Sequence, residues 1–262
     1  MAELTSKSLN AAPTNFHKWL GELHNMGKLL RVYTQNIDGL EMKAGLATYP
    51  NQQAGPRMQT SSNCCISLHG SLQRLRCISC SDTFLTETYI DLLHQGVFPR
   101  CSSCIKSAKI RQLEGKRPLS VPIIRPDIVL YGEPFNPAEG EITSIANQDR
   151  KTVDLLLVVG TSLHIPGTSL HIPGTREIVR IFSEKLRERV VREGNGIRSI
   201  FINMEKFRGG GQVEKYFDAW VKGDCQEFAC MMMEDKELHS VQEMAKEYAL
   251  TRQDSRPLWR YY

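Results

Sequence analysis

Two short-spaced pairs of cysteines constrain the fold of this 262-residue chain more than any other feature. Cys77 and Cys80 form one Cys-x2-Cys pair, and Cys101 and Cys104 form the second. Each pair can fold as a tight knuckle that points both sulfurs at one centre, so the spacing predicts one tetrahedral zinc ion held by four thiolates. Four protein ligands leave no position for water or substrate, which makes the predicted zinc structural. The alternatives are four unrelated cysteines, which the regular spacing disfavours, and two disulfides, which the lack of a secretory leader disfavours.

Composition and charge fit a globular protein that contacts a polyanion or simply carries basic loops. Hydrophobic residues make up 41% and charged residues 24%, and no run of eighteen apolar residues predicts a membrane span. The formal net charge is +4, and the stretch 100–125 holds seven basic residues against the single acid Glu114. This stretch is either a solvated loop or a surface that contacts nucleic acid or chromatin.

Strand-like and helix-like segments alternate along the chain. Strands are predicted at 29–33, 66–68, 126–133 (with a turn), 154–159, 198–203 and 219–222. Helices are predicted from the Thr14 cap to Gly27, from Thr86 to about Leu93, at 137–148, at 175–193 and from Cys225 to Met232. Residues 1–13 have no pattern, and 47–63 form a polar loop. The alternation predicts an α/β protein with a parallel, doubly wound sheet into which a small zinc module is inserted.

Polar residues follow several predicted strands, where ligands gather in open α/β sheets. Gln35-Asn36-Ile37-Asp38 reads equally well as a polar site or as ordinary turn chemistry. Gly160-Thr161-Ser162 follows the most apolar strand and suits a nucleotide phosphate or ribose. His69 lies between a strand and the zinc module, next to a glycine that lets a substrate approach. Cys64 and Cys65 read as ordinary thiols.

An unusual repeat follows this site. The heptapeptide GTSLHIP at 160–166 recurs unchanged at 167–173. Two copies of seven residues are too few and too short for a solenoid, so they indicate a local duplication that loops out. We expect the first copy to contact the ligand, because it follows the strand directly.

These motifs together resemble one family, the sirtuins. The resemblance rests on TQNIDGLE at 34–41, LHGSL at 68–72, the two cysteine pairs, RPDIVLYGE at 125–133, VVGTSL at 158–163, FIN at 201–203 and GDC at 223–225. It covers about residues 14–235 and is strongest with the fungal branch that acts on nuclear histones. It implies a Rossmann-like domain with a smaller zinc-binding domain, a nuclear location, and NAD-dependent removal of acetyl or longer acyl groups from lysine in proteins such as histone tails.

The resemblance also implies roles for individual residues. His69 would be the general base that deprotonates a ribose hydroxyl of NAD, which suits a group that titrates near neutral pH. The catalytic nicotinamide pocket and the adjoining ribose would contact Gln35, Asn36, Ile37 and Asp38. The rest of NAD would contact Gly160, Thr161, Ser162, Asn203 and Cys225. Residues 128–132 would pair with the substrate peptide by strand addition.

The sequence departs from the family pattern at its start. Sirtuins begin with a strand, a Gly-Ala-Gly phosphate loop and an Asp-Phe-Arg motif, and none of these precedes Asn15. We therefore expect an N-terminally truncated catalytic domain over 1–262 that lacks the first βα unit. Its parts would be a zinc module at 64–125, the remaining Rossmann-like part at 126–235 and a mostly helical tail at 236–262. The alternatives are an inactive, zinc-stabilised binding module and a mono-ADP-ribosyltransferase.

Overall fold

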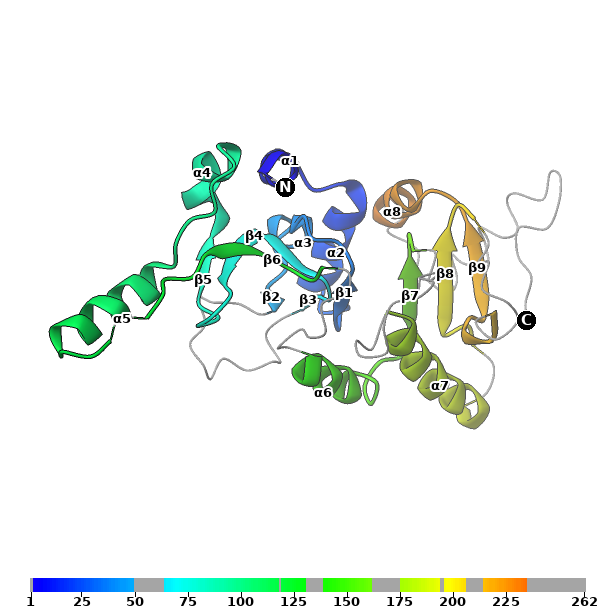
Figure 1. Cartoon of the computed structure of the whole chain (residues 1–262). Coiled ribbons are helices and arrows are strands. Elements are labelled where there is room, and N and C mark those ends of the chain that lie inside the picture. The colour runs from blue at the N-terminus through cyan, green and yellow to red at the C-terminus, as the bar shows by residue number, and fades with distance from the viewer. Residues whose placement is uncertain are drawn as a thin grey trace.

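The structure is a computed structural model that describes residues 2–49, 64–117, 119–130, 139–161, 175–193, 196–205 and 214–234. Within these residues the chain forms three sheets of three strands each (Figure 1). The first is parallel, with the order β1 (Val32–Thr34), β3 (Cys65–Ser67), β2 (Thr48–Tyr49). The second is antiparallel, with the order β5 (Thr83–Leu85), β4 (Gly70–Cys77), β6 (Ile124–Ile128). The third is parallel, with the order β7 (Leu156–Val159), β8 (Ser199–Asn203), β9 (Ala219–Lys222).

Helices surround the two parallel sheets and extend from the antiparallel one. Those near the parallel sheets are α2 (Asn15–Asn25), α3 (Leu40–Lys43), α6 (Glu139–Asp149), α7 (Thr175–Glu193) and α8 (Cys225–Glu234), with the short 3-10 turn η3 (Glu214–Tyr216). Helix α1 (Ala2–Asn10) lies against β4 of the antiparallel sheet. The antiparallel sheet carries the 3-10 turn η2 (Thr86–Tyr89), α4 (Ile90–His94) and α5 (Ser102–Leu113). Figure 1 shows α5 extending away from the body of the molecule, and none of its residues is buried.

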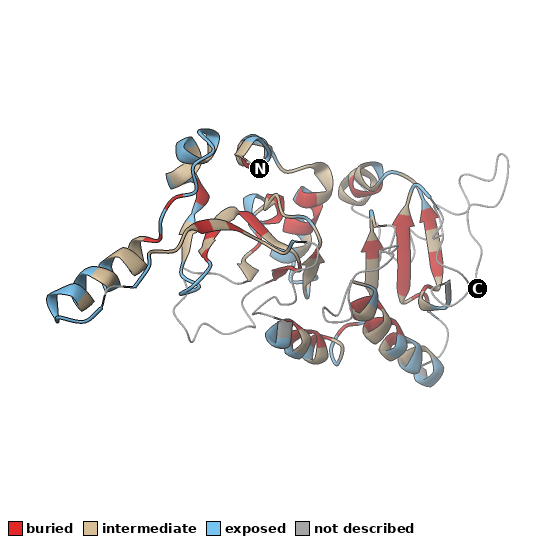
Figure 2. Ribbon diagram, viewed as in Figure 1, coloured by how far each residue is buried: buried red, intermediate tan, exposed pale blue. Residues whose placement is uncertain are grey.

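Strand β8 lies at the centre of the core. Side chains alternate between the two faces of a strand, and here Ile200 and Ile202 pack with Trp19 of α2, whereas Phe201 packs with Val179 of α7. Four of the five β8 residues are buried (Figure 2). Burial on both faces is what the continuous apolar sequence of a parallel strand provides.

The predicted α/β class is confirmed, with one difference in the sheet. The sequence predicted a single doubly wound parallel sheet, but the described parallel strands form two sheets. The reason is that β1 pairs with β3 and β7 pairs with β8, while no hydrogen-bonded ladder joins β1 to β7 among the described residues.

One local prediction was wrong, because the polar loop predicted at 47–63 begins with β2. Two further elements were not predicted: α1 in the patternless N-terminus, and α5 in the basic stretch, for which a loop was one of two readings. Helix α1 depends on a tertiary contact: the Lys43 ammonium donates to the carbonyl oxygens of Ser8, Leu9 and Ala11 at 2.9, 2.7 and 2.8 Å. These acceptors lie at the C-terminal end of the helix, where carbonyls lack intrahelical partners.

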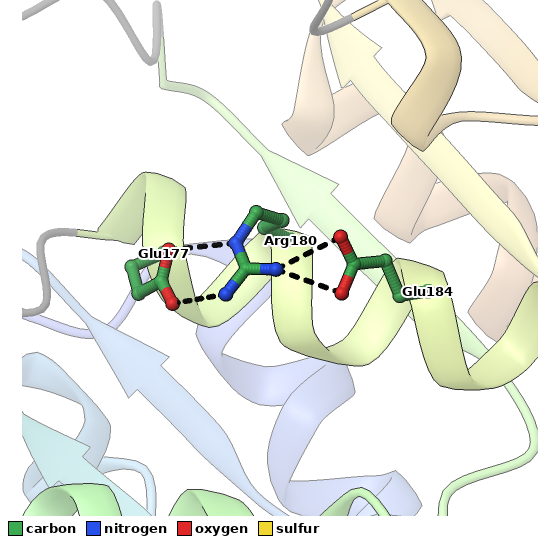
Figure 3. A network of polar contacts seen from close by, with 3 residues as sticks. All are labelled: Glu177, Arg180 and Glu184. Carbon is green, nitrogen blue, oxygen red and sulfur yellow. Dashed lines mark hydrogen bonds and ion pairs between the residues drawn. The ribbon is translucent and has the colours of Figure 1, made fainter.

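Two ion-pair groups show the contrast between buried and exposed charge. Asp149 of α6 accepts from the Arg31 guanidinium and, at 2.6 Å, from the Tyr33 hydroxyl, which ties α6 to β1 in a buried position. On α7, by contrast, Arg180 donates to Glu177 and Glu184 at the surface (Figure 3). These bonds, led by the one to Glu177, raise the pKa of Arg180, but exposed pairs of this kind contribute little to stability.

Some predicted features lie outside the described residues: residues 131–133 of the strand predicted at 126–133, Ser162, the heptapeptide repeat beyond Thr161, and the tail 236–262. Among the described helices, none is both long and apolar enough to cross a membrane.

Candidate active site and metal centre

His69 sits where β3 ends and β4 begins, against the loop that follows β1. Its Nδ1 lies 3.2 Å from the carbonyl oxygen of Gln35, and its own carbonyl oxygen accepts from the backbone N–H of Val129 at 3.0 Å. The next residue must be glycine: Gly70 has a φ of 81°, and a Cβ there would lie 2.1 Å from the carbonyl oxygen of Asp127. The packing of β4 against β6 therefore fixes the position of the histidine.

Three of the predicted cofactor residues form a hydrogen-bonded series at the carboxyl ends of β1, β7 and β8. The Thr161 hydroxyl donates to Oε1 of Gln35 at 3.0 Å, and Nδ2 of Asn203 donates to the carbonyl oxygen of Thr161 at 3.2 Å. Gln35 also contacts His69 through its carbonyl, so these side chains converge on one edge of the two parallel sheets. Gly160 has a φ of 64°, and a Cβ on this residue would meet no described atom within 4 Å, so there is open space beside them.

The loop from Asn36 to Asp38 has the turn geometry that the sequence left open. The Asn36 N–H donates to Oγ1 of Thr34 at 3.1 Å, and the Leu40 N–H donates to Oδ1 of Asp38 at 3.1 Å. Gly39, with a φ of 71°, makes this turn into α3. The turn reading is thus confirmed for one oxygen of Asp38, and a role in a ligand pocket stays a prediction.

Cys225 lies at the first position of α8, at the far end of the same edge. Burial first, and then the charge of Asp224, raise the pKa of its thiol. The backbone after β9 extends this edge of the sheet beside β8, because the Gly223 N–H donates to the carbonyl oxygen of Asn203 at 3.3 Å. Cys225 therefore lies two residues after the backbone contact to Asn203, and its contact with the adenosine end of NAD stays a prediction.

The four paired cysteines form a compact sulfur cluster. Their Sγ atoms all lie within 4.8 Å of one another, with Cys77 3.9 Å from Cys104 and Cys80 3.6 Å from Cys101. A tetrahedral zinc ion with Zn–S bonds near 2.3 Å requires sulfurs about 3.8 Å apart. Burial opposes ionisation of Cys77, but the N–H groups of Cys80 and Ser79 donate to its sulfur and lower its pKa to about 7. The cluster thus fits a zinc ion in the spacing of its four sulfurs, as predicted.

The remaining cysteines do not join this cluster. Cys64 and Cys65 are buried, and burial raises the pKa of both thiols. Cys65 belongs to β3, and both pack in the apolar cluster that includes Leu20 and Leu46. The interpretation of these two residues as ordinary thiols is confirmed.

Sequence reasoning missed two side chains that contact the loop of residues 35–38, which we call the site loop. Ser8 of α1 and Gln73 of β4 both bond to the carbonyl oxygen of Asp38. No sequence signal could have paired a serine with a glutamine 65 positions away, because each residue type is common and neither belongs to a motif.

Comparison with known sequences identifies the chain's relatives. The profile of the Sir2 family matches residues 1–167. The chain is 37% identical over 229 residues to the NAD-dependent protein deacetylase hst4 of Emericella nidulans, covering 86% of this chain and 35% of that protein. It is 33% identical over 240 residues to the NAD-dependent histone deacetylase HST3 of Candida albicans, covering 88% of this chain and 46% of that protein.

Solved structures show the same fold. One, of a Sir2 homologue mutant in complex with ADP ribose, aligns with a TM-score of 0.56 at 21% identity, covering 96% of this chain and 74% of that one. Another, Sir2 bound to acetylated peptide, aligns with a TM-score of 0.56 at 24% identity, covering 87% and 72%. This chain spans between 35% and 60% of the length of the first five curated relatives that it matches.

Proposed function

This chain belongs to the Sir2 family, the sirtuins, and from that premise we propose that it is an NAD-dependent protein-lysine deacetylase acting on histone tails in the nucleus. The observation that carries the proposal is the contact between His69 and the Gln35 carbonyl, because it brings the imidazole, our proposed general base, beside the loop predicted to bind nicotinamide. Fungal relatives named as NAD-dependent histone deacetylases support the substrate class and the nuclear location.

The described residues fit NAD by the chemistry of their donors and acceptors. Amide and hydroxyl groups of Gln35, Thr161 and Asn203 line the edge and suit ribose and phosphate, and the open space at Gly160 lets a ligand approach the backbone. When bound, NAD supplies the ribose carbon that receives the acyl oxygen as nicotinamide leaves. Ile37, Asn36 and Asp38 would hold the nicotinamide end and Cys225 the adenosine end.

The hydrogen bond to Gln35 assigns the working nitrogen of His69. A carbonyl oxygen can only accept, so the 3.2 Å contact places a proton on Nδ1 of the neutral ring. Nε2 is then the basic nitrogen and takes the proton of a ribose hydroxyl. The carbonyl oxygen of Gln35 thus orients the His69 ring, and this ring acts on the NAD held by the same loop.

The zinc ion has a separate, structural role in this proposal. The thiolates of Cys77, Cys80, Cys101 and Cys104 would fill its four coordination positions and would leave none open to water or substrate. It holds the antiparallel sheet and α5 in place and takes no part in bond making or breaking.

Replacing His69 tests the assignment of the base. We expect His69→Ala to lower deacetylation of an acetylated histone peptide by a factor of about 10² to 10⁴, the range that general-base catalysis contributes. Its melting temperature should stay near that of the wild type. His24→Ala, an exposed histidine on α2, is the matched control, and unchanged turnover in His69→Ala would remove this residue from its role.

Product analysis of the same reaction separates the alternatives. Nicotinamide release together with peptide deacetylation supports the deacetylase. Nicotinamide release with transfer of ADP-ribose to protein supports mono-ADP-ribosyl transfer. Neither product, in a protein that retains zinc, supports an inactive binding module.

Helix α5 supports a further part of the proposal, a contact with chromatin DNA through the basic stretch 100–125. Lys106 and Lys109 lie one helical turn apart and are exposed, and α5 extends away from the body (Figure 2). Ammonium groups on an exposed helix can neutralise phosphates, which makes binding fall steeply with salt.

Charge reversal on α5 tests this contact. We expect Lys106→Glu/Lys109→Glu to weaken binding to double-stranded DNA and to reduce the slope of log affinity against log salt by about 2. The matched control is Lys18→Glu/Lys28→Glu, which makes the same charge change at exposed positions elsewhere. Equal losses in both variants would show that net charge alone governs binding.

A further inference from the structure

The carbonyl oxygen of Asp38 is held by a closed set of three hydrogen bonds. The Ser8 hydroxyl donates to it at 2.7 Å and the Gln73 side-chain amide donates to it at 2.9 Å. The second amide hydrogen of Gln73 goes to the Ser8 oxygen at 3.0 Å. A carbonyl oxygen has two lone pairs, so these two donors satisfy this one completely.

The three residues come from separate parts of the fold. Ser8 is only 5% exposed and lies on α1, whose C-terminal carbonyls bind Lys43 of α3. Gln73 lies on β4, one residue after Leu72, whose N–H donates to the carbonyl oxygen of Ile37 at 2.8 Å. Strand β4 therefore holds two successive carbonyls of the site loop, one by its backbone and one by a side chain.

The carbonyl that Ser8 and Gln73 hold belongs to a peptide unit that could otherwise rotate. It joins Asp38 to Gly39, and Gly39 occupies the left-handed region with a φ of 71°. Glycine also populates the alternative conformations at little cost, so the turn itself does not fix the direction of this carbonyl. The side chain of Gln73 also limits the space, since a Cβ on Gly39 would lie 2.9 Å from its Cγ.

We propose that Ser8 and Gln73 are positioning residues that fix the Asp38–Gly39 peptide and so orient the nicotinamide-binding loop. The inference rests on the proposed function, because it takes Asn36 and Asp38 as the nicotinamide contacts. Rotation of this peptide would turn the Asp38 side chain, which caps the next turn through Leu40, and would displace the loop against His69.

The geometry separates this role from a purely structural one. Removing either side chain alone leaves the Asp38 carbonyl with one donor, so neither single variant leaves that carbonyl unsatisfied. Ser8→Ala also removes the acceptor of one amide hydrogen of Gln73, a side chain that is only half-buried. The fold should therefore tolerate each single change, while the loop loses one of the two bonds that set its direction. The double variant removes both bonds.

The experiment compares Gln73→Leu, Ser8→Ala and the double variant with the wild-type chain. Ser6→Ala is the matched control, because Ser6 lies on the same helix but bonds to His94 of α4. Hydrogen exchange of the peptide containing residues 35–43, measured without ligand, reports loop order. Steady-state kinetics with NAD and an acetylated peptide report three constants for each variant: the KM for NAD, the KM for the peptide and the inhibition constant of nicotinamide.

We expect exchange at 35–43 to accelerate in both single variants and most in the double variant. The KM for NAD and the inhibition constant of nicotinamide should rise about three- to tenfold in each single variant, while the KM for the peptide and the melting temperature stay near wild type. Ser6→Ala should leave exchange at 35–43, the KM for NAD and the inhibition constant of nicotinamide at their wild-type values.

Two results would overturn the proposal. One is unchanged exchange at 35–43 in the double variant; the other is a lowered melting temperature with unchanged NAD and nicotinamide constants, which indicates a merely structural role. If the wild-type chain neither binds nor consumes NAD, the proposed function fails, and the exchange measurement still decides whether Ser8 and Gln73 hold the loop.

Discussion

Removing zinc with a strong chelator is expected to unfold the antiparallel sheet together with α5. The apolar cluster of this module has four buried residues, Leu75, Cys77, Cys101 and Ile124, and two of the four are proposed zinc ligands. A core this small cannot offset the conformational entropy of the module. Structural zinc contributes on the order of 10 kcal/mol to folding, which is the largest single effect expected in this protein.

The measurement pairs metal analysis with hydrogen exchange. Purified protein should contain one zinc ion per chain, and chelation should release it while exchange accelerates throughout β4, β5, β6 and α5. Cys104→Ser should have the same effect, whereas Cys230→Ser, which changes a thiol bonded to Asn15, should retain zinc. Release of zinc with an unchanged circular dichroism spectrum would contradict the structural role.

Asp149→Ala is expected to destabilise the parallel part of the fold by about 3–5 kcal/mol, the cost of removing one partner of a buried ion pair. The Asp149 and Arg31 side chains are only 6% and 8% exposed. Burial favours loss of the Arg31 proton, but the hydrogen bond to Asp149 and its charge outweigh burial and raise the pKa of Arg31. The substitution therefore removes the carboxylate beside a guanidinium that stays charged, and it also removes the acceptor of the Tyr33 hydroxyl.

Urea denaturation provides the test. Arg31→Met/Asp149→Leu, which replaces the pair by apolar groups, should be less destabilised than Asp149→Ala, because it removes the Arg31 charge together with that of Asp149. Glu188→Gln, which removes an exposed ion pair with Lys185, should change stability by no more than about 0.5 kcal/mol. Equal stability of Asp149→Ala and the wild type would show that this pair does not join α6 to β1.

The sequence predicted the features that depend on local pattern. The spacing of four cysteines is a local property, and it identified the sulfur cluster. The apolar periodicity of 175–193 predicted α7 with both of its ends, because helix-forming residues fill it without interruption. Strands β8 and β9 were likewise located to within a residue.

Features that depend on distant contacts could not be read in this way. Helix α1 has a polar sequence, and its C-terminal end is stabilised by Lys43, which is more than thirty positions away. The two-residue strand β2 is too short for alternation to be visible and exists because β3 offers it a parallel partner. In the site, the sequence indicated the turn at Asp38. The two side chains that donate to the Asp38 carbonyl, Ser8 and Gln73, become neighbours only after folding.

Strand β4 connects the predicted zinc site directly to His69, the proposed catalytic base. Its eight residues begin directly after His69 and end on the predicted zinc ligand Cys77. Strand β6 pairs with both ends of β4, with a register shift between Ser71 and Leu75. Fraying that starts at the Cys77 end would therefore need to cross only this one interrupted strand to disorder the imidazole. In a preparation of this protein, the rate of the proposed deacetylation would then also report how many molecules carry their metal.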